Sequence, residues 1–174
     1  RDRTNNVISI TSNSKTSVTS KSIDFNGGLI QVTDRSSPLY GLKINIPPAA
    51  IFETVQFQIS YADITKIDGL PQDCSIASKL ISIKVSGSDV FNKYQMFQKP
   101  IEVTLPYDST VTNDDSSPIR FYWYDSQNKK LDSMGFLQED KNAKTITFLT
   151  ASFSDFVAVK VYIQLSKLIG VTNY

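Results

Sequence analysis

The chain has 174 residues, a length that suits one compact domain with room for an additional strand at either end. Lys and Arg total 18 and Asp and Glu total 17, so the formal charge of +1 offers no electrostatic attraction for nucleic acid or an acidic membrane surface. Histidine is absent and Cys74 is the single cysteine, which excludes an internal disulfide, a thiolate metal site and the commonest general base. We expect Cys74 to be buried as a small hydrophobic side chain. No run of 18 apolar residues is present, so we expect no membrane-spanning helix.

Composition favours strands over helices along the whole chain. Ile, Val, Thr and Ser are abundant and Phe and Tyr are frequent, whereas the strong helix formers Ala, Glu and Met are sparse and Leu is less common than Ile. Residues 1–21 are rich in Ser, Thr and Asn with a β-prone patch at 7–10, and they are predicted to form a linker or an edge strand. From residue 22 onward apolar and polar residues alternate, which is the period of a half-buried strand. The predicted strands are residues 23–25, 29–32, 42–46, 55–61, 80–85, 101–105, 121–124, 145–149 and 156–163.

Turn signals separate these strands. Asn26-Gly27-Gly28 is a strong turn signal, and Pro47-Pro48 ends the strand that precedes it. Regularly spaced strands without a helical window predict an all-β fold, either a sandwich or a barrel. Residues 161–174 form a β-prone tail that is too apolar for a simple linker. Its apolar residues include Leu165, Leu168, Ile169 and Val171.

Three segments together resemble a known family. Gly27-Gly28, the segment GLKINIPPAA at 41–50 and the segment KPIEVTLP at 99–106 are similar in order and spacing to the ZU-five domain. That domain is a β-sandwich of ankyrins, netrin receptors and many bacterial surface proteins. The resemblance covers roughly residues 22–160, and it implies an antiparallel, immunoglobulin-like β-sandwich that is a module of an extracellular or cell-surface protein.

The resemblance extends to a self-cleavage site. Many relatives carry His-Phe-Ser before the last strand, and in some of them the histidine activates the serine to attack the preceding carbonyl. The matching residues here are Ser152, Phe153 and Ser154. Serine in the place of histidine removes the base, and Asp155 is too acidic to replace it at neutral pH. We therefore expect no autoproteolysis.

The strand at 121–124 carries aromatic side chains on both faces. Alternation places Phe121 and Trp123 on one face and Tyr122 and Tyr124 on the other. We expect Trp123 to lie in the core and the two tyrosines to be partly exposed. Exposed tyrosines would permit an alternative function, in which Tyr122 and Tyr124 form the sugar-stacking platform of a carbohydrate-binding module.

One polar loop contains several hard oxygen ligands. Asp108, Asp114 and Asp115, together with Asn113, are the residue types that bind calcium. Their spacing does not match the twelve-residue calcium loop, and solvated loop acids are the commoner explanation. Calcium binding by this loop is therefore a hypothesis that the geometry of the loop can test.

The two chain termini are the candidate interaction segments. Val7, Ile8 and Ile10 at one end, and the apolar tail at the other, either add strands to their own sandwich or pair with an exposed edge of a neighbouring subunit. We expect the N-terminal patch to pair within its own chain, and both arrangements remain open for the tail. Head-to-tail pairing between copies would propagate into a fibre unless it closed into a ring.

These observations favour a non-enzymatic, extracellular or cell-surface β-sandwich with a structural or adhesive role and no cofactor. Its expected partners are proteins, including copies of itself joined by strand addition, and glycans, but not nucleic acid. A hydrolase is the least favoured reading, because the chain lacks histidine and no catalytic motif is recognisable.

Overall fold

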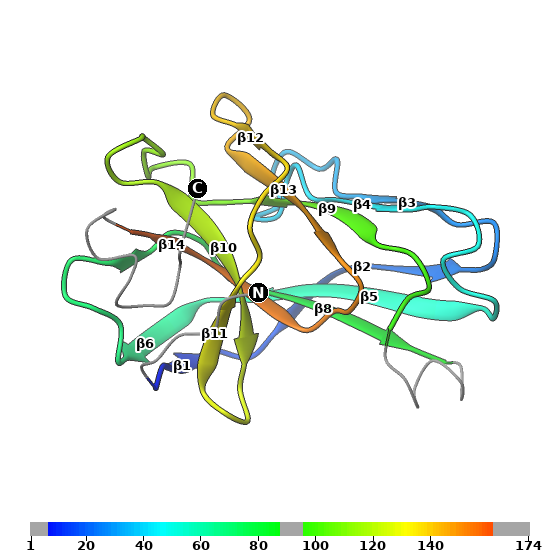
Figure 1. Ribbon diagram of the computed structural model, residues 1–174, viewed down its shortest axis with the longest axis horizontal. Helices are drawn as coiled ribbons and strands as arrows, with labels where there is room; N and C mark the ends of the chain where they lie inside the picture. The colour runs from blue at the N-terminus through cyan, green and yellow to red at the C-terminus, as the bar shows by residue number, and fades with distance from the viewer. Residues whose placement is uncertain (1–6, 88–95, 162–174) are drawn as a thin grey trace.

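The computed structural model describes residues 7–87 and 96–161 of the chain. Every regular element within these residues is a strand, and the strands pair antiparallel in three sheets. The predicted all-β sandwich is therefore confirmed (Figure 1). No helix in this described part of the chain has the length and apolar character needed to cross a membrane.

Two facing sheets form the sandwich, and we call them the large sheet and the small sheet. The strand order of the large sheet is β11 (Lys130–Ser133), β10 (Ile119–Asp125), β14 (Asp155–Lys160), β8 (Leu80–Ser86), β5 (Val55–Ala62) and β2 (Thr16–Ile23), and β7 (Ser75–Ile76) also pairs with β14. The order of the small sheet is β12 (Gln138–Asp140), β13 (Thr145–Thr150), β9 (Ile101–Pro106), β4 (Lys43–Ile46) and β3 (Gly28–Gln31). Figure 1 shows β3, β4 and β9 as a layer above β2, β5 and β8.

The main core lies between these two sheets. Alternate side chains point into it, as Val55, Phe57 and Ile59 of β5 do, because successive residues of a strand face opposite sides. The Phe57 ring also contacts Phe97 and Phe153, with ring centroids 5.7 and 5.4 Å away. The bulkiest fully buried phenylalanines of this core are Phe57, Phe121, Phe148 and Phe156.

The turn from β2 to β3 connects the two sheets and requires a glycine. Gly27 has a φ of 73°, and a Cβ at this position would lie 2.3 Å from the carbonyl oxygen of Ile46. The Asn-Gly-Gly signal in the sequence thus reflects a left-handed backbone conformation and the close approach of the neighbouring chain segment.

The third sheet consists of β1 (Ser9–Ser12) and β6 (Ile64–Asp68), and we call it the flap. β1 leads into β2 and β5 leads into β6, so the β1–β6 pair continues the β2–β5 pair in nearly the same register. At the bend between them the amide of Asn13 donates to the carbonyl oxygen of Asp63 (2.9 Å). The four strands therefore form one long antiparallel ribbon that turns away from the large sheet at residues 13–15.

The flap covers the outer face of the large sheet, where a second core forms. Figure 1 shows β1 and β6 together below the sandwich, at the lower left. The strand β2 begins at Thr16, so it crosses the boundary that the sequence suggested between residues 21 and 22. The buried members of the second core are Ile8, Cys74, Leu80, Tyr122, Tyr124, Leu131, Val157, Val159 and Val161.

Candidate functional site

Residues 7–12 occupy a site built by the rest of the chain, which we call the strand-binding site. It comprises β6 and the outer face of β10, β11 and β14. Ile8 is completely buried there, and its amide donates to the carbonyl oxygen of Lys129 (2.8 Å). Ile10 lies opposite Ile67 in the flap. One buried side chain and a set of backbone hydrogen bonds thus hold an added strand.

Tyr124 binds the backbone of this strand. Its hydroxyl donates to the carbonyl oxygen of Ile8 and accepts from the amide of Ile10, both at 3.1 Å. Tyr122 is fully buried in the same core. The expectation that Tyr122 and Tyr124 are partly exposed is wrong, because the flap covers that face of β10. Neither ring can serve as a sugar-stacking platform while the flap is closed, whereas Trp123, on the opposite face, packs against the main core.

Gly69 allows the N-terminal strand to approach the flap. It has a φ of 93°, and a Cβ at this position would lie 1.9 Å from the carbonyl oxygen of Val7. The side chain of Val7 is 61% exposed, so Val7 contributes its backbone rather than its side chain to the contact. Any side chain at position 69 would displace the strand.

Sequence reasoning missed the second core, although one signal could have revealed it. Residues 156–159 of β14 are successive apolar residues and all are buried, which is typical of a strand covered on both faces. The strand β6 has no clean alternation of apolar and polar residues, so its five residues were not predicted as a strand.

The interaction residues that were predicted near the C-terminus lie outside the described residues. Val161, the last described residue, is buried in the second core, and its amide donates to the carbonyl oxygen of Pro118 (2.9 Å). Four predicted interaction residues fall outside the described residues. They are Leu165, Leu168, Ile169 and Val171.

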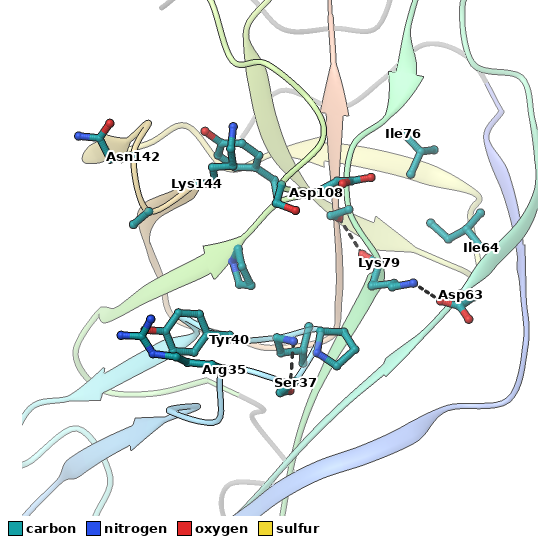
Figure 2. Close-up of a pocket in the computed structure, with 17 residues that line it drawn as sticks. Arg35, Ser37, Tyr40, Asp63, Ile64, Ile76, Lys79, Asp108, Asn142 and Lys144 are labelled. Atoms are coloured by element: carbon teal, nitrogen blue, oxygen red, sulfur yellow. Dashed lines mark hydrogen bonds and ion pairs between the residues drawn. The ribbon is translucent and has the colours of Figure 1, made fainter.

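A polar groove of about 820 Å³ opens at one end of the sandwich (Figure 2). Its walls come from the β3–β4 loop with Arg35 and Tyr40, the β5–β6 bend with Asp63, the end of β9 and the β12–β13 turn with Lys144. In Figure 2, Arg35 and Tyr40 lie on one side, Lys144 and Asn142 lie across from them, and Lys79 pairs with Asp63 at the far end. The groove was not predicted, because its parts are far apart in the sequence.

Both carboxylates of the groove have partners within the chain. Asp63 forms an ion pair with Lys79. Asp108 accepts hydrogen bonds from the amide and the hydroxyl of Thr110 (2.9 and 2.8 Å), and these bonds, with a smaller contribution from the charges of Lys79 and Lys144, hold its pKa below the usual value. Asp108 therefore stays ionised at neutral pH.

The acidic loop does not gather its carboxylates into one site. Asp108 lines the groove, while Asp114 and Asp115 line a separate pocket of about 220 Å³. Hydrogen bonds from Ser116 and Ser117 lower the pKa of Asp114, and Asp115 is fully exposed near Lys141. Among the described residues, no three His, Cys, Asp or Glu side chains are grouped as metal ligands would be.

The same pocket contains an ion pair that joins the two sheets. Arg120 of β10 donates to Glu139 of β12 (2.7 Å), and its guanidinium lies 4.3 Å from the ring centroid of Phe136. The side chain of Asn113 also donates to Glu139 (3.1 Å) and accepts from the amide of Ile119. Asn113 thus orders the loop instead of offering its oxygen to a cation.

Ser152, Phe153 and Ser154 lie in the loop before β14. The Phe153 ring packs edge-on against two phenylalanines of the main core, at centroid distances of 5.4 and 5.6 Å. The carbonyl oxygen of Ser154 accepts a hydrogen bond from the amide of Ile83 (2.9 Å). Residues 152–154 thus anchor the loop to the sandwich.

A serine and a lysine also meet near this loop. Lys15 donates to the hydroxyl oxygen of Ser82 (3.1 Å) and pairs with Asp155 (3.4 Å). A lysine that acts as a general base must be neutral and is normally desolvated, whereas Lys15 is half exposed and paired with a carboxylate. Lys15 thus links the bend at residues 13–15 to β8 and β14.

A scan against protein-family models finds no match to this chain, and a search of the curated proteins finds none either. Within the described residues, the strand-binding site, which pairs with the backbone of β1, and the polar groove are the candidate binding sites.

Proposed function

We propose that this chain is a non-enzymatic building block of an extracellular or cell-surface assembly, whose copies are joined by strand addition. The observation that carries the proposal is the strand-binding site, in which β1 is bound as an added strand. Copies would be joined when residues 7–12 of one chain enter the strand-binding site of the next.

The contacts of β1 support exchange between copies. They comprise backbone pairing to β6, two hydrogen bonds to Tyr124 and the burial of Ile8. None of them depends on the covalent link to β2, which consists of residues 13–15 alone. The same segment of a second copy therefore fits the same site, the situation that permits domain swapping.

The flap is also the element best suited to open. It is a two-stranded sheet, and such sheets are marginally stable on their own. Opening exposes the second core and the edge of β6, and both can be covered again by an incoming strand. If each chain gives its β1 to the next chain and receives β1 from the previous one, the copies form a filament or a ring.

The extracellular setting rests on the resemblance to the ZU-five domain. The segments that carry it lie in the sandwich, with Gly27 in the β2–β3 turn, residues 41–50 around β4 and residues 99–106 around β9. The proposal assigns no cofactor and no catalytic residue to the chain.

Size in solution tests the proposal. Light scattering and negative-stain microscopy would compare the full chain with a variant that lacks residues 1–12 and a variant that lacks residues 162–174. We expect oligomers or filaments of the full chain that disappear without residues 1–12. A peptide of residues 1–15 should bind to the shortened chain in trans.

A full chain that stays monomeric at high concentration, together with no binding of that peptide, contradicts the proposal. Loss of assembly only on removal of residues 162–174 would move the connecting strand to the other terminus. The fluorescence of Trp123, which packs against the main core, reports whether each shortened chain is folded.

A further inference from the structure

The polar groove of Figure 2 has the size and composition of a ligand site. Its volume of about 820 Å³ falls within the usual range of small-molecule pockets, roughly 300–1,000 Å³. Both sheets and the bend of the flap contribute to its walls, and the groove is open at its rim rather than enclosed. It can therefore admit a chain of linked rings from solvent.

The charges of the groove leave a surplus of positive charge. Three cations, Arg35, Lys79 and Lys144, face two carboxylates, Asp63 and Asp108. Lys79 is neutralised by its ion pair with Asp63. No described residue forms an ion pair with Arg35 or Lys144 in its present position. Arg35 and Lys144, set against the remaining carboxylate of Asp108, thus leave a net surplus of one positive charge, and the Lys144 ammonium also donates to the carbonyl oxygen of Val111 (3.5 Å).

An exposed aromatic ring lies beside one of these cations. Tyr40 is 44% exposed, and the guanidinium carbon of Arg35 lies 5.7 Å from its ring centroid. Across the groove the Lys144 ammonium lies 5.9 Å from the centroid of the Tyr107 ring. The ring of Tyr40 presents a flat apolar face, and the guanidinium of Arg35 presents paired donors that match a carboxylate.

The backbone of the groove is not available for strand pairing. The amide of Tyr40 donates to Ser37, that of Tyr107 to Lys144, and that of Asp108 to Ala77. The walls are mainly loops, turns and strand ends, which offer no row of free backbone groups to an extended peptide. The free polar groups are side chains. Among the described residues, the Asn142 carboxamide and the Ser109 hydroxyl make no hydrogen bond, so both can bond to ligand hydroxyls.

We propose that this groove binds an acidic oligosaccharide, with one sugar ring stacked on Tyr40 and the carboxylate of that sugar held by Arg35. A further sugar of the same chain lies across the groove, where its carboxylate contacts Lys144 and its hydroxyl groups bond to Asn142 and Ser109. The site is independent of strand addition, since it uses neither the strand-binding site nor the terminal segments. It would give an assembled surface layer or fibre an adhesive contact with acidic polysaccharide.

Titration calorimetry and amide NMR of the full chain with a trimer of galacturonic acid test the proposal. We expect saturable binding, with shifts confined to the amides of the groove. Arg35→Gln should weaken the affinity about tenfold or more, the usual effect of removing a hydrogen bond to a charged group. Tyr40→Ala should weaken it about threefold to tenfold, the range of an aromatic contact. Added salt should also weaken binding.

Two control variants remove the same kinds of side chain at positions outside the groove. Lys43→Gln removes an exposed cation of β4, and Phe52→Ala removes an aromatic side chain that is 67% exposed in the β4–β5 loop. Both should bind the trimer with unchanged affinity. Absence of binding overturns the proposal, as does equal affinity for the neutral sugar maltotriose or for tri-glutamate. Arg35→Gln with full affinity overturns it as well.

Discussion

The two cores of the molecule are closed in different ways. The main core lies between the large and the small sheet, and its four fully buried phenylalanines come from strands that have a neighbouring strand on both sides. Among the described residues, the second core is closed on its outer side by the flap, in which β1 has four residues and β6 has five, and by the loop after β6 with Leu70 and Cys74. Elements with few buried contacts open at lower free energy than the rest of a fold. We therefore expect the second core to open while the main core stays closed.

Each core contains a natural probe. Trp123 is the single tryptophan and packs against the main core, and Cys74 is the single cysteine and belongs to the second core. Cys74 is 8% exposed, as the sequence led us to expect. Tryptophan fluorescence thus follows the sandwich, and the rate of thiol labelling follows the flap.

The largest effect is expected in the main core. Phe57→Ala removes a completely buried ring that contacts two other aromatic rings, so it should lower the free energy of unfolding by about 3–5 kcal/mol. Urea denaturation followed by Trp123 fluorescence measures this loss. A decrease in the free energy of unfolding below about 1 kcal/mol would contradict the conclusion that the main core is the more firmly closed of the two.

Gly69→Ala should act on the flap alone. Its Cβ would clash with the carbonyl oxygen of Val7, and its φ of 93° costs a residue with a side chain about 1–2 kcal/mol. We expect labelling of Cys74 to accelerate about tenfold or more, with a much smaller shift of the unfolding midpoint reported by Trp123.

Gly135→Ala is the matched control for this variant. Gly135 also has a positive φ, 65°, but no atom lies within 4 Å of a Cβ built there. It should therefore leave the labelling rate of Cys74 unchanged. If both variants accelerate the labelling of Cys74 equally, the cause is backbone strain in general and not the displacement of β1.

Tyr124→Phe should have a smaller effect on the same core. The change removes both hydrogen bonds to β1 and leaves the buried carbonyl oxygen of Ile8 without that donor, which costs about 1–3 kcal/mol. Labelling of Cys74 should accelerate, but less than in the glycine variant. Tyr61→Phe, which removes a hydroxyl from a tyrosine packed against the main core, should not accelerate it.

The smallest expected effect is on the stability of the fold at acidic pH. The folded pKa of Asp108 lies below the ordinary value of 3.8, chiefly because of the hydrogen bonds from Thr110. Its contribution to stability is therefore complete above that value and is lost as the pH falls through the lowered pKa. Asp108→Asn should remove this contribution, less than about 1 kcal/mol because the group is exposed, and flatten the stability profile below pH 4. An unchanged acid profile would contradict this assignment.

The two cores also mark how far the sequence predicts the structure. Strands that face the main core, such as those at residues 42–46 and 55–61, show a period of two and were predicted within a residue or two. The tyrosines of β10 were correctly assigned to one face, but alternation does not reveal whether a second layer covers that face. The flap strands are too short for a clear period, and the groove brings together loops that no sequence spacing connects.

The most direct test of strand exchange uses the pairing of Thr11 with Lys66 in the flap. Directly opposed residues of antiparallel strands lie close enough for a disulfide. One tagged chain would carry Thr11→Cys and a differently tagged chain Lys66→Cys, both with Cys74→Ala, and the mixture would be oxidised. A chain with both cysteines, which should close its own disulfide, is the positive control.

Exchange of β1 between copies predicts a disulfide-linked dimer that contains one chain of each tag, in excess over dimers of identical chains. If the control closes its disulfide while the mixed chains stay monomeric, β1 serves only its own chain, and the proposed assembly through the strand-binding site is contradicted.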